Sequence, residues 1–194
     1  MPSVTLPLVL ASGSPRRREL LSLMGLAYTV DTPDVDESFS GKPEEMVCEL
    51  SRRKAEAVAP RHASALILSA DTTVCGEDGR ILGKPGTPEN ARRMLAELSG
   101  KWHDVFTGMT LINTSTGERM TQAVRTRVHF VELTSEEIDA YVATKSPLDK
   151  AGAYGIQDMG GMFVDRIEGS YSNVVGLPMA QLRDMLARIA PAAR

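Results

Sequence analysis

The sequence has few cysteines, no long apolar run and no basic excess, and each of these absences excludes a class of protein. Its only cysteines, Cys48 and Cys75, form no disulfide framework and lack the spacing of a redox or zinc pair. No apolar run approaches the ~18 residues that a membrane span needs. The segment 1–7 has no positive charge ahead of its apolar residues. We therefore expect a reduced, soluble, cytoplasmic protein with no membrane partner.

The charge balance is slightly acidic. Lys and Arg number 22 against 25 Asp and Glu, which gives a formal net charge of −3. A protein that binds the phosphates of a nucleic acid polymer usually has a basic excess, so we expect no such partner. A local basic cluster can still bind a small anion. The 42% hydrophobic and 24% charged content excludes a disordered chain, a collagen and a simple coiled coil.

The 194 residues indicate one domain, because domains usually have roughly 150 residues. Strand and helix signals alternate along the chain, which predicts α/β or α+β layers. Strands are expected over residues 8–11, 65–70, 81–82, 102–112, 124–131 and 163–167. Helices are expected from residue 15 to a stop at 25, from 43 to a stop at 60, from 88 to a stop at 100, after a capping box at 134–137, and from 178.

The strongest local signal is the segment 11–18, which reads ASGSPRRR. A strand leads through small residues into a helix with arginines in its first turn. Free N–H groups at a helix N-terminus bind anions, the hydroxyls of Ser12 and Ser14 can donate, and the planar Arg16 guanidinium suits phosphate oxygens. The alternative is an ordinary capped helix with solvated arginines. Arginines there oppose the helix dipole, however, so helix formation does not require them.

Asp71 closes the expected strand 65–70, and in open α/β sheets ligands bind beyond the carboxyl ends of strands. A carboxylate there can hold a divalent cation or orient a water molecule, and the alternative is a capping aspartate. An acidic cluster of Asp34, Asp36 and Glu37 offers oxygen ligands that suit Mg²⁺ or Mn²⁺, unless it is a solvated loop. The histidines show no zinc-ligand spacing.

Other catalytic motifs are absent or incomplete. Gly83-Lys84 is similar to the end of a phosphate-binding P-loop, but Asp78 replaces the first glycine of that motif and Pro85 replaces its Ser/Thr. Lys84 is then either a point charge for phosphate or a surface lysine. No nucleophile elbow or dinucleotide fingerprint occurs, which disfavours a serine hydrolase and a Rossmann dehydrogenase.

A series of segments resembles, in this order, the Maf-type nucleoside triphosphate pyrophosphatases. They are ASGSPRR at 11–17, ADTTV at 70–74, LGKP at 82–85, the stretch 98–108, DKAGAYGIQ at 149–157 and GSYSNVVGLP at 169–178. The resemblance covers nearly the whole chain, and it implies a single Maf-like domain over residues 1–194. It also implies an α/β fold with a twisted mixed sheet flanked by helices, in two lobes around a cleft, similar to inosine triphosphate pyrophosphatases.

The resemblance further implies an activity. The form GAYGIQ resembles the branch that hydrolyses dTTP and UTP, whereas another branch acts on 7-methyl-GTP. We expect metal-dependent cleavage between the α and β phosphates, giving a monophosphate and pyrophosphate. Members usually need a divalent metal, here Mg²⁺ or Mn²⁺, and are often dimeric, so a homodimer is expected. The alternatives are a pyrophosphatase of the same family that acts on 7-methyl-GTP or another modified nucleotide, or a nucleotide-binding regulator of cell division.

Roles for single residues follow from the matched motifs. By resemblance, Asp71 is the catalytic proton acceptor, and with Glu37 it holds the metal or orients water. Lys54 and Lys84 are the expected catalytic cations of the cleft. Residues expected to bind the substrate are Ser12, Ser14, Arg16, Arg17, Thr72 and Gln157. Asp158 follows Gln157 where the family commonly has glycine, and its charge is expected to shift the loop or repel a triphosphate.

Overall fold

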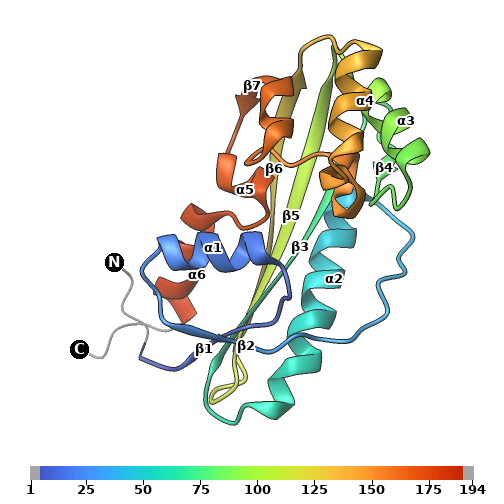
Figure 1. Ribbon diagram of the computed structural model, residues 1–194. Coiled ribbons are helices and arrows are strands. Elements are labelled where there is room, and N and C mark those ends of the chain that lie inside the picture. Colours follow the sequence, from blue (N-terminus) through green and yellow to red (C-terminus); the bar gives the residue numbers. More distant parts are fainter. Residues whose placement is uncertain (1–4, 190–194) are drawn as a thin grey trace. The chain divides into compact units, whose positions relative to one another are not determined.

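The computed structural model describes residues 5–189 (Figure 1). Residues 1–4, which are part of the N-terminal segment considered above, lie outside this range, as do residues 190–194. The strands are β1 (Leu8–Leu10), β2 (Tyr28–Val30), β3 (Leu66–Cys75), β4 (Ile81–Leu82), β5 (Trp102–Asn113), β6 (Arg119–Phe130) and β7 (Val164–Glu168). The α-helices are α1 (Pro15–Leu23), α2 (Pro43–Val58), α3 (Pro88–Leu98), α4 (Ser135–Ala143), α5 (Tyr171–Val175) and α6 (Met179–Ile189). Short 3₁₀ turns are η1 (Ala59–Arg61), η2 (Ser146–Asp149), η3 (Ala151–Ala153) and η4 (Met159–Phe163).

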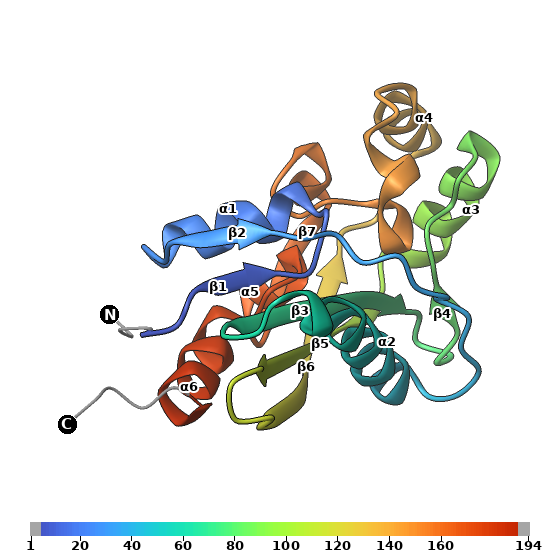
Figure 2. The same cartoon turned by 90° about the horizontal axis from the view of Figure 1, so that it is seen from below.

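The strands form one open, mixed sheet, which confirms the expected α/β class. Its order is β2-β1-β3-β5-β6-β7, and β4 pairs with β3 off this path. Strand β1 pairs in parallel with both β2 and β3, as Figure 2 shows, whereas the β3–β4 and β6–β7 pairs are antiparallel. Within residues 5–189, none of the helices has both the length and the apolar composition that crossing a membrane requires.

The expected end of the strand that contains Asp71, a candidate catalytic residue, is wrong. Strand β3 does not end at Asp71 but runs to Cys75, so Asp71 lies inside the strand. The reason is local, because the β-branched residues Thr72, Thr73 and Val74 favour an extended backbone as much as the apolar run before them. Strand β2 and helix α5 were not expected, and β6 begins at Arg119 rather than at residue 124.

The chain divides into two compact units, and the expectation of a single domain stays a prediction. Unit 1 contains the described residues up to 71, then 107–124, and those from 176 onward. Unit 2 contains residues 72–106 and 125–175. Both cysteines are free thiols, as expected, with Cys75 buried and Cys48 half-buried.

In unit 1, helix α2 packs closely on the sheet. A Cβ at Gly108 of β5 would lie 2.3 Å from the Val47 carbonyl oxygen, so only glycine allows this approach. Ser69 Oγ on β3 donates to the Ser51 carbonyl of α2 at 2.5 Å, and Ser51 Oγ lies 3.0 Å from Thr110 Oγ1. These buried contacts fix the face of α2 that also carries the residue one turn further along, Lys54.

In unit 2, helices α3 and α4 contact each other and lie side by side in Figure 1. Helix α4 begins with the expected capping box, since Thr134 and Glu137 each accept the other's backbone N–H. The core contains several aromatic rings in edge-to-face contact, which hold α4 and the segment 151–163 together. These rings belong to Phe130, Tyr141, Tyr154 and Phe163.

Candidate functional site

Among the expected site residues, the most buried charges are Lys54 and Asp71, which form an ion pair between α2 and β3. Lys54 Nζ lies 2.6 Å from Asp71 Oδ1 and 2.7 Å from Glu37 Oε1. The Lys54 and Asp71 side chains are 11% and 12% exposed, whereas Glu37 is 55% exposed. Unit 1 therefore brings together three of the residues that sequence reasoning assigned to catalysis and metal binding.

The acidic loop before α2 contributes only part of its expected cluster. Asp36 accepts hydrogen bonds from the backbone N–H of Ser38 at 2.9 Å and from its hydroxyl at 2.6 Å. These bonds lower the pKa of the Asp36 carboxyl. The next residue, Glu37, extends to Lys54 instead. The turn at Asp36 thus holds the chain so that Glu37 faces the buried pair.

The start of α1 has the expected form, with Ser14 at the N-cap and Pro15 in the first turn. The Ser14 side chain makes no capping hydrogen bond. Ser12 Oγ instead accepts from the Ser14 backbone N–H at 3.3 Å and from Arg17 Nη1 at 3.0 Å. A hydroxyl that accepts two bonds still has its own O–H to donate, so Ser12 and Ser14 both remain suitable donors for an anion.

Arg17 is directed into unit 1 rather than into solvent. Its Nε donates to the Gly176 carbonyl at 3.0 Å, and its Nη1 donates to Ser12. Burial lowers the pKa of the guanidinium, while the charges of Asp71 and Glu37 act in the opposite direction and that of Arg16 adds to the lowering. The start of α1 and the Lys54–Asp71 pair therefore lie within electrostatic reach of each other.

The donor set of this cluster fits a metal that arrives with a phosphate substrate. Mg²⁺ is typically held by one or two carboxylates together with waters and substrate phosphates, and Glu37 and Asp71 are two carboxylates directed at one point, the Lys54 ammonium. In the described part of the chain, no group of three or more His, Cys, Asp or Glu side chains forms a metal cage. The carboxylates alone supply too few ligands for zinc-type closed coordination.

The other expected site residues, Thr72, Lys84 and Gln157, belong to unit 2. Thr72 is half-buried on β3, and Lys84 is exposed just after β4. The Gly152 backbone N–H donates to the Gly83 carbonyl at 3.3 Å, so the segment with Lys84 is joined to the start of the segment 151–161. A side chain at Gly152 would collide with Val74, and its φ of +69° also favours glycine.

Gln157 lies at an exposed turn. The Asp158 N–H donates to the Gly155 carbonyl at 3.2 Å, and this bond closes a turn with Ile156 and Gln157 at its two central positions. Gln157 is exposed, whereas Gly155 is buried. Backbone hydrogen bonds therefore define the chain on both sides of Gln157, one of the residues expected to bind the substrate.

The Asp158 carboxylate faces its own unit. It accepts from Tyr141 Oη at 3.0 Å, Ser146 Oγ at 3.0 Å and the Gly160 N–H at 2.9 Å, and Lys150 Nζ lies 3.5 Å away. Burial raises the pKa of the Asp158 carboxyl, but these donors and the Lys150 charge outweigh it and hold the pKa below the ordinary value. The negative charge expected to repel a triphosphate is thus surrounded by donors.

Sequence reasoning did not assign Tyr141 or Ser146 any part in the site. Tyr141 lies in the helix expected after the capping box, and it is 1% exposed. A buried phenol hydroxyl usually needs a hydrogen-bond partner, and this signal was available in the sequence. Its partners, Gly155 and Asp158, lie 14 and 17 positions away, so the sequence alone did not reveal them.

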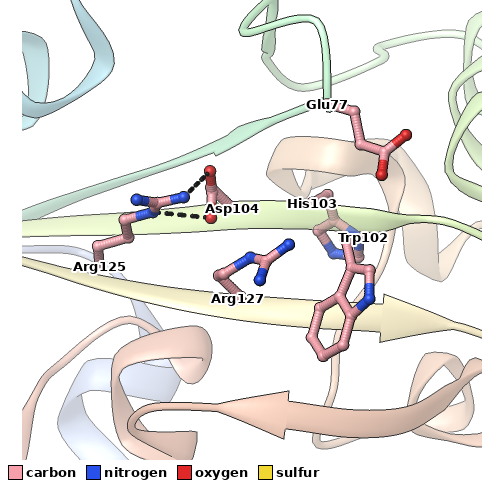
Figure 3. A pocket seen from close by; sticks show the side chains of 6 residues that line it. All are labelled: Glu77, Trp102, His103, Asp104, Arg125 and Arg127. Carbon is pink, nitrogen blue, oxygen red and sulfur yellow. Dashed lines mark hydrogen bonds and ion pairs between the residues drawn. The ribbon is translucent and has the colours of Figure 1, made fainter.

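A separate pocket of about 370 Å³ lies on the polar side of β5 and β6 in unit 2 (Figure 3). Both arginines of this pocket already form ion pairs with neighbouring carboxylates. Arg125 donates to both carboxylate oxygens of Asp104 at 2.8 Å, and Arg127 pairs with Glu168 and stacks 4.6 Å above the Trp102 ring centroid. None of the residues expected to bind or process a substrate lines this pocket.

Comparison with known proteins adds an independent finding. A family model described as Maf-like protein matches residues 7–189. The chain is 51% identical over 182 residues to a protein of Moorella thermoacetica named dTTP/UTP pyrophosphatase, and the match covers 93% of each chain. Proteins of the same name from Bacillus cytotoxicus and Bacillus cereus are 50% and 49% identical, over 90% of this chain and 91% of theirs.

Proposed function

The chain belongs to the Maf-like protein family, and on this premise we propose that it is a nucleoside triphosphate pyrophosphatase that acts on dTTP and UTP. Relatives named for this activity are about half identical to it over nine-tenths of its length. The structural observation that carries the proposal is the Asp71 carboxylate, buried in β3 and held by Lys54 beside Glu37.

The chemical problem in this reaction is electrostatic, because water must approach a highly charged anion. The phosphoanhydride between the α and β phosphates is cleaved, and the products are the nucleoside monophosphate and pyrophosphate. Asp71 is the proposed acceptor of the water proton. Lys54 holds Asp71 Oδ1 at 2.6 Å, so the carboxylate is fixed before substrate binds.

The cations of the site are proposed to bind the triphosphate. Arg16 offers a planar fork to two phosphate oxygens, and the first-turn N–H groups of α1, with the hydroxyls of Ser12 and Ser14, offer further donors. Arg17, through its bonds to Ser12 and Gly176, also holds this turn in place. Lys54 and Lys84 add positive charge that offsets the charge building on the phosphate oxygens.

A divalent metal, Mg²⁺ or Mn²⁺, is part of the proposal. Glu37 and Asp71 are the side chains that would hold it. When bound, such an ion neutralises phosphate charge and lowers the pKa of coordinated water.

Base selection is proposed to depend on Gln157, with Thr72 and Arg16 contributing to substrate choice. A side-chain amide carries a donor and an acceptor side by side. Uracil and thymine present an N3–H donor beside the O4 acceptor, so one amide answers both groups. The thymine methyl is apolar and is tolerated, which accounts for dTTP and UTP together. Cytoplasmic location and a homodimer stay predictions of the resemblance.

The decisive experiment is a pyrophosphate-release assay with Mg²⁺ across dTTP, UTP, CTP and 7-methyl-GTP. The proposal expects the highest kcat/KM for dTTP and UTP. If 7-methyl-GTP or CTP is the best substrate, the assignment to the dTTP/UTP branch is wrong. If every nucleotide binds but none is cleaved, the chain is a nucleotide-binding regulator rather than an enzyme.

A further inference from the structure

We propose that Asp158 is a positioning residue that, with Tyr141, fixes the turn carrying Gln157 and so sets discrimination between uracil and cytosine nucleotides. This inference rests on the proposed function, in which Gln157 reads the base. It assigns a specific role to a residue whose carboxylate is bound by Tyr141, Ser146 and the Gly160 N–H.

Both ends of the turn are attached to one oxygen atom. The Gly155 backbone N–H donates to Tyr141 Oη at 3.2 Å, and Tyr141 Oη donates to Asp158 Oδ1 at 3.0 Å. Gln157 lies between these two attachment points. The backbone hydrogen bond from the Asp158 N–H to the Gly155 carbonyl already closes this turn. The path from Gly155 through the Tyr141 hydroxyl to the Asp158 carboxylate links the same two residues a second time.

The carboxylate also fills the inside of the turn. A Cβ at Gly155 would lie only 2.5 Å from Asp158 Oδ2, and a Cβ at Gly160 would lie 2.8 Å from the Tyr141 hydroxyl. Both glycines therefore allow the backbone to come close to these two polar groups. The arrangement leaves little space for Asp158 to adopt another rotamer without opening the turn.

The Tyr141 phenol, which bonds to both ends of the turn, is itself held in place by its neighbours. Tyr141 lies on α4, and its ring packs edge-on against Phe163 at a centroid distance of 5.2 Å. The other carboxylate oxygen of Asp158 is bound by Ser146 Oγ at 3.0 Å. Lys150 Nζ, 3.5 Å from the same oxygen, donates to Ser146 Oγ at 3.1 Å. Asp158 thus ties the turn to α4 and η2 at once.

A rigid turn is important because the Gln157 side-chain amide can by itself pair with either uracil or cytosine. Cytosine presents an unprotonated N3 and an amino group, the reverse of the uracil pattern, and an amide that is free to turn over satisfies either base. Discrimination arises only where the surroundings restrict the reader, since unmatched buried polar groups are then costly. Fixing the backbone at Gln157 limits the positions from which its amide can reach the base edge.

The test measures kcat/KM for UTP and CTP in Asp158→Ala, Asp158→Asn, Tyr141→Phe and Gln157→Glu, with Asp139→Ala as the matched control. Asp139 is an exposed carboxylate on the same helix as Tyr141 and pairs with Arg92. We expect the UTP-to-CTP ratio to fall about tenfold or more in Asp158→Ala and Tyr141→Phe, mainly through KM for UTP. The Asn variant keeps one acceptor oxygen and should recover part of the ratio, whereas the control keeps all of it.

Each outcome decides between the inference and its premise. If Gln157→Glu changes the ratio but Tyr141→Phe and both Asp158 variants do not, the positioning role is wrong and the proposed function stands. If Gln157→Glu leaves the ratio unchanged, Gln157 is not the base reader and the inference fails with that part of the proposal. If Asp158→Ala does not fold, as judged by its melting curve, the UTP-to-CTP ratios of Asp158→Asn and Tyr141→Phe test the positioning role instead. An equal loss of kcat for both nucleotides in these variants would indicate a merely structural role.

Discussion

The Nζ atom of Lys54 lies 2.6 Å from Oδ1 of Asp71, and this contact joins a helix to a strand across 17 positions of the chain. A buried charge is stable only with a partner, and removing one member of such a pair typically costs about 3–5 kcal/mol. Here Glu37 also contacts Lys54, at 2.7 Å, so the ammonium keeps a counter-charge if Asp71 loses its own. The charge of Asp71 can therefore be removed without leaving the lysine alone.

Asp71→Asn is expected to lower kcat by at least about a hundredfold, because it removes the proposed proton acceptor while keeping its size. The fold should persist, since Glu37 remains beside Lys54. The measurements are kcat for UTP and a thermal melting curve, with Glu56→Gln as the control, because this α2 carboxylate pairs with Arg52 and Arg119 and not with Lys54. Near-wild-type turnover in a folded Asp71→Asn protein would remove Asp71 from the mechanism.

Arg16→Lys is expected to weaken triphosphate binding by ~1.5–3 kcal/mol, because a point charge does not replace a bidentate guanidinium fork. Titration with a non-hydrolysable UTP analogue measures this directly. Arg18→Lys is the matched control, because Arg18 is exposed on the same helix. If the two variants bind the analogue equally well, Arg16 does not bind the triphosphate, and the segment is an ordinary capped helix with solvated arginines.

Chelation with EDTA is expected to abolish pyrophosphate release without unfolding the protein. The fold is expected to persist, because a chain of 194 residues is long enough to bury a core that needs no metal to hold it together. Activity should return with Mg²⁺ or Mn²⁺, while circular dichroism stays constant throughout. Full activity after exhaustive chelation would contradict the proposed use of a metal.

Gln157→Glu is expected to lower kcat/KM for UTP and dTTP by about tenfold or more, because a carboxylate cannot donate to O4 of the base. The turn should remain intact, because Gln157 is exposed and the turn is closed by the backbone of Gly155 and Asp158. Steady-state kinetics with both nucleotides measure the effect, and Met159→Leu, at another exposed position nearby, is the control.

The stability of the protein is expected to fall as the pH is lowered below 6.5, because His103 is buried in its neutral form. Burial lowers the pKa of His103 to about 3. Between that value and the ordinary 6.5, the unfolded chain binds a proton that the folded chain does not, so the free energy of unfolding decreases as the pH falls. The contribution is about 2 kcal/mol between pH 6.5 and pH 5.

Urea unfolding at several pH values tests this linkage. His103→Gln should flatten the dependence on pH between 6.5 and 5 even if it lowers stability overall. His129→Gln, on the polar side of β6 beside Asp165, serves as the comparison. A His103→Gln protein with the full wild-type slope would show that another group is responsible.

Apart from α5, the α-helices followed from local signals, as did most strands. The capping box at Thr134 and Glu137 and the start of α3 at Pro88 were visible as short residue patterns, because a helix end depends on its nearest neighbours. Strand β2 was missed because its three residues, Tyr28–Val30, are half-buried or exposed and show no alternation. Its position is defined by parallel pairing with β1, which no local pattern reports.

The candidate site was predictable in its residue types but not in its partnerships. The family resemblance singled out Asp71, Lys54 and Glu37, yet the shared contact at the Lys54 ammonium depends on how α2 packs on β3. Asp158 shows the limit more clearly. From the sequence it was an unscreened charge beside Gln157, whereas its donors come from α4 and η2, up to 17 positions away.

The division into two compact units has a practical consequence for dissecting this protein. Unit 1 is assembled from three stretches of chain, and unit 2 is inserted between them in two. Strands β3, β5 and β6 each begin in one unit and end in the other, with Asp71 and Thr72 as consecutive residues on either side of a boundary. Neither unit can therefore be produced by truncating the gene from one end, and complementation between separately expressed halves would require cuts inside strands.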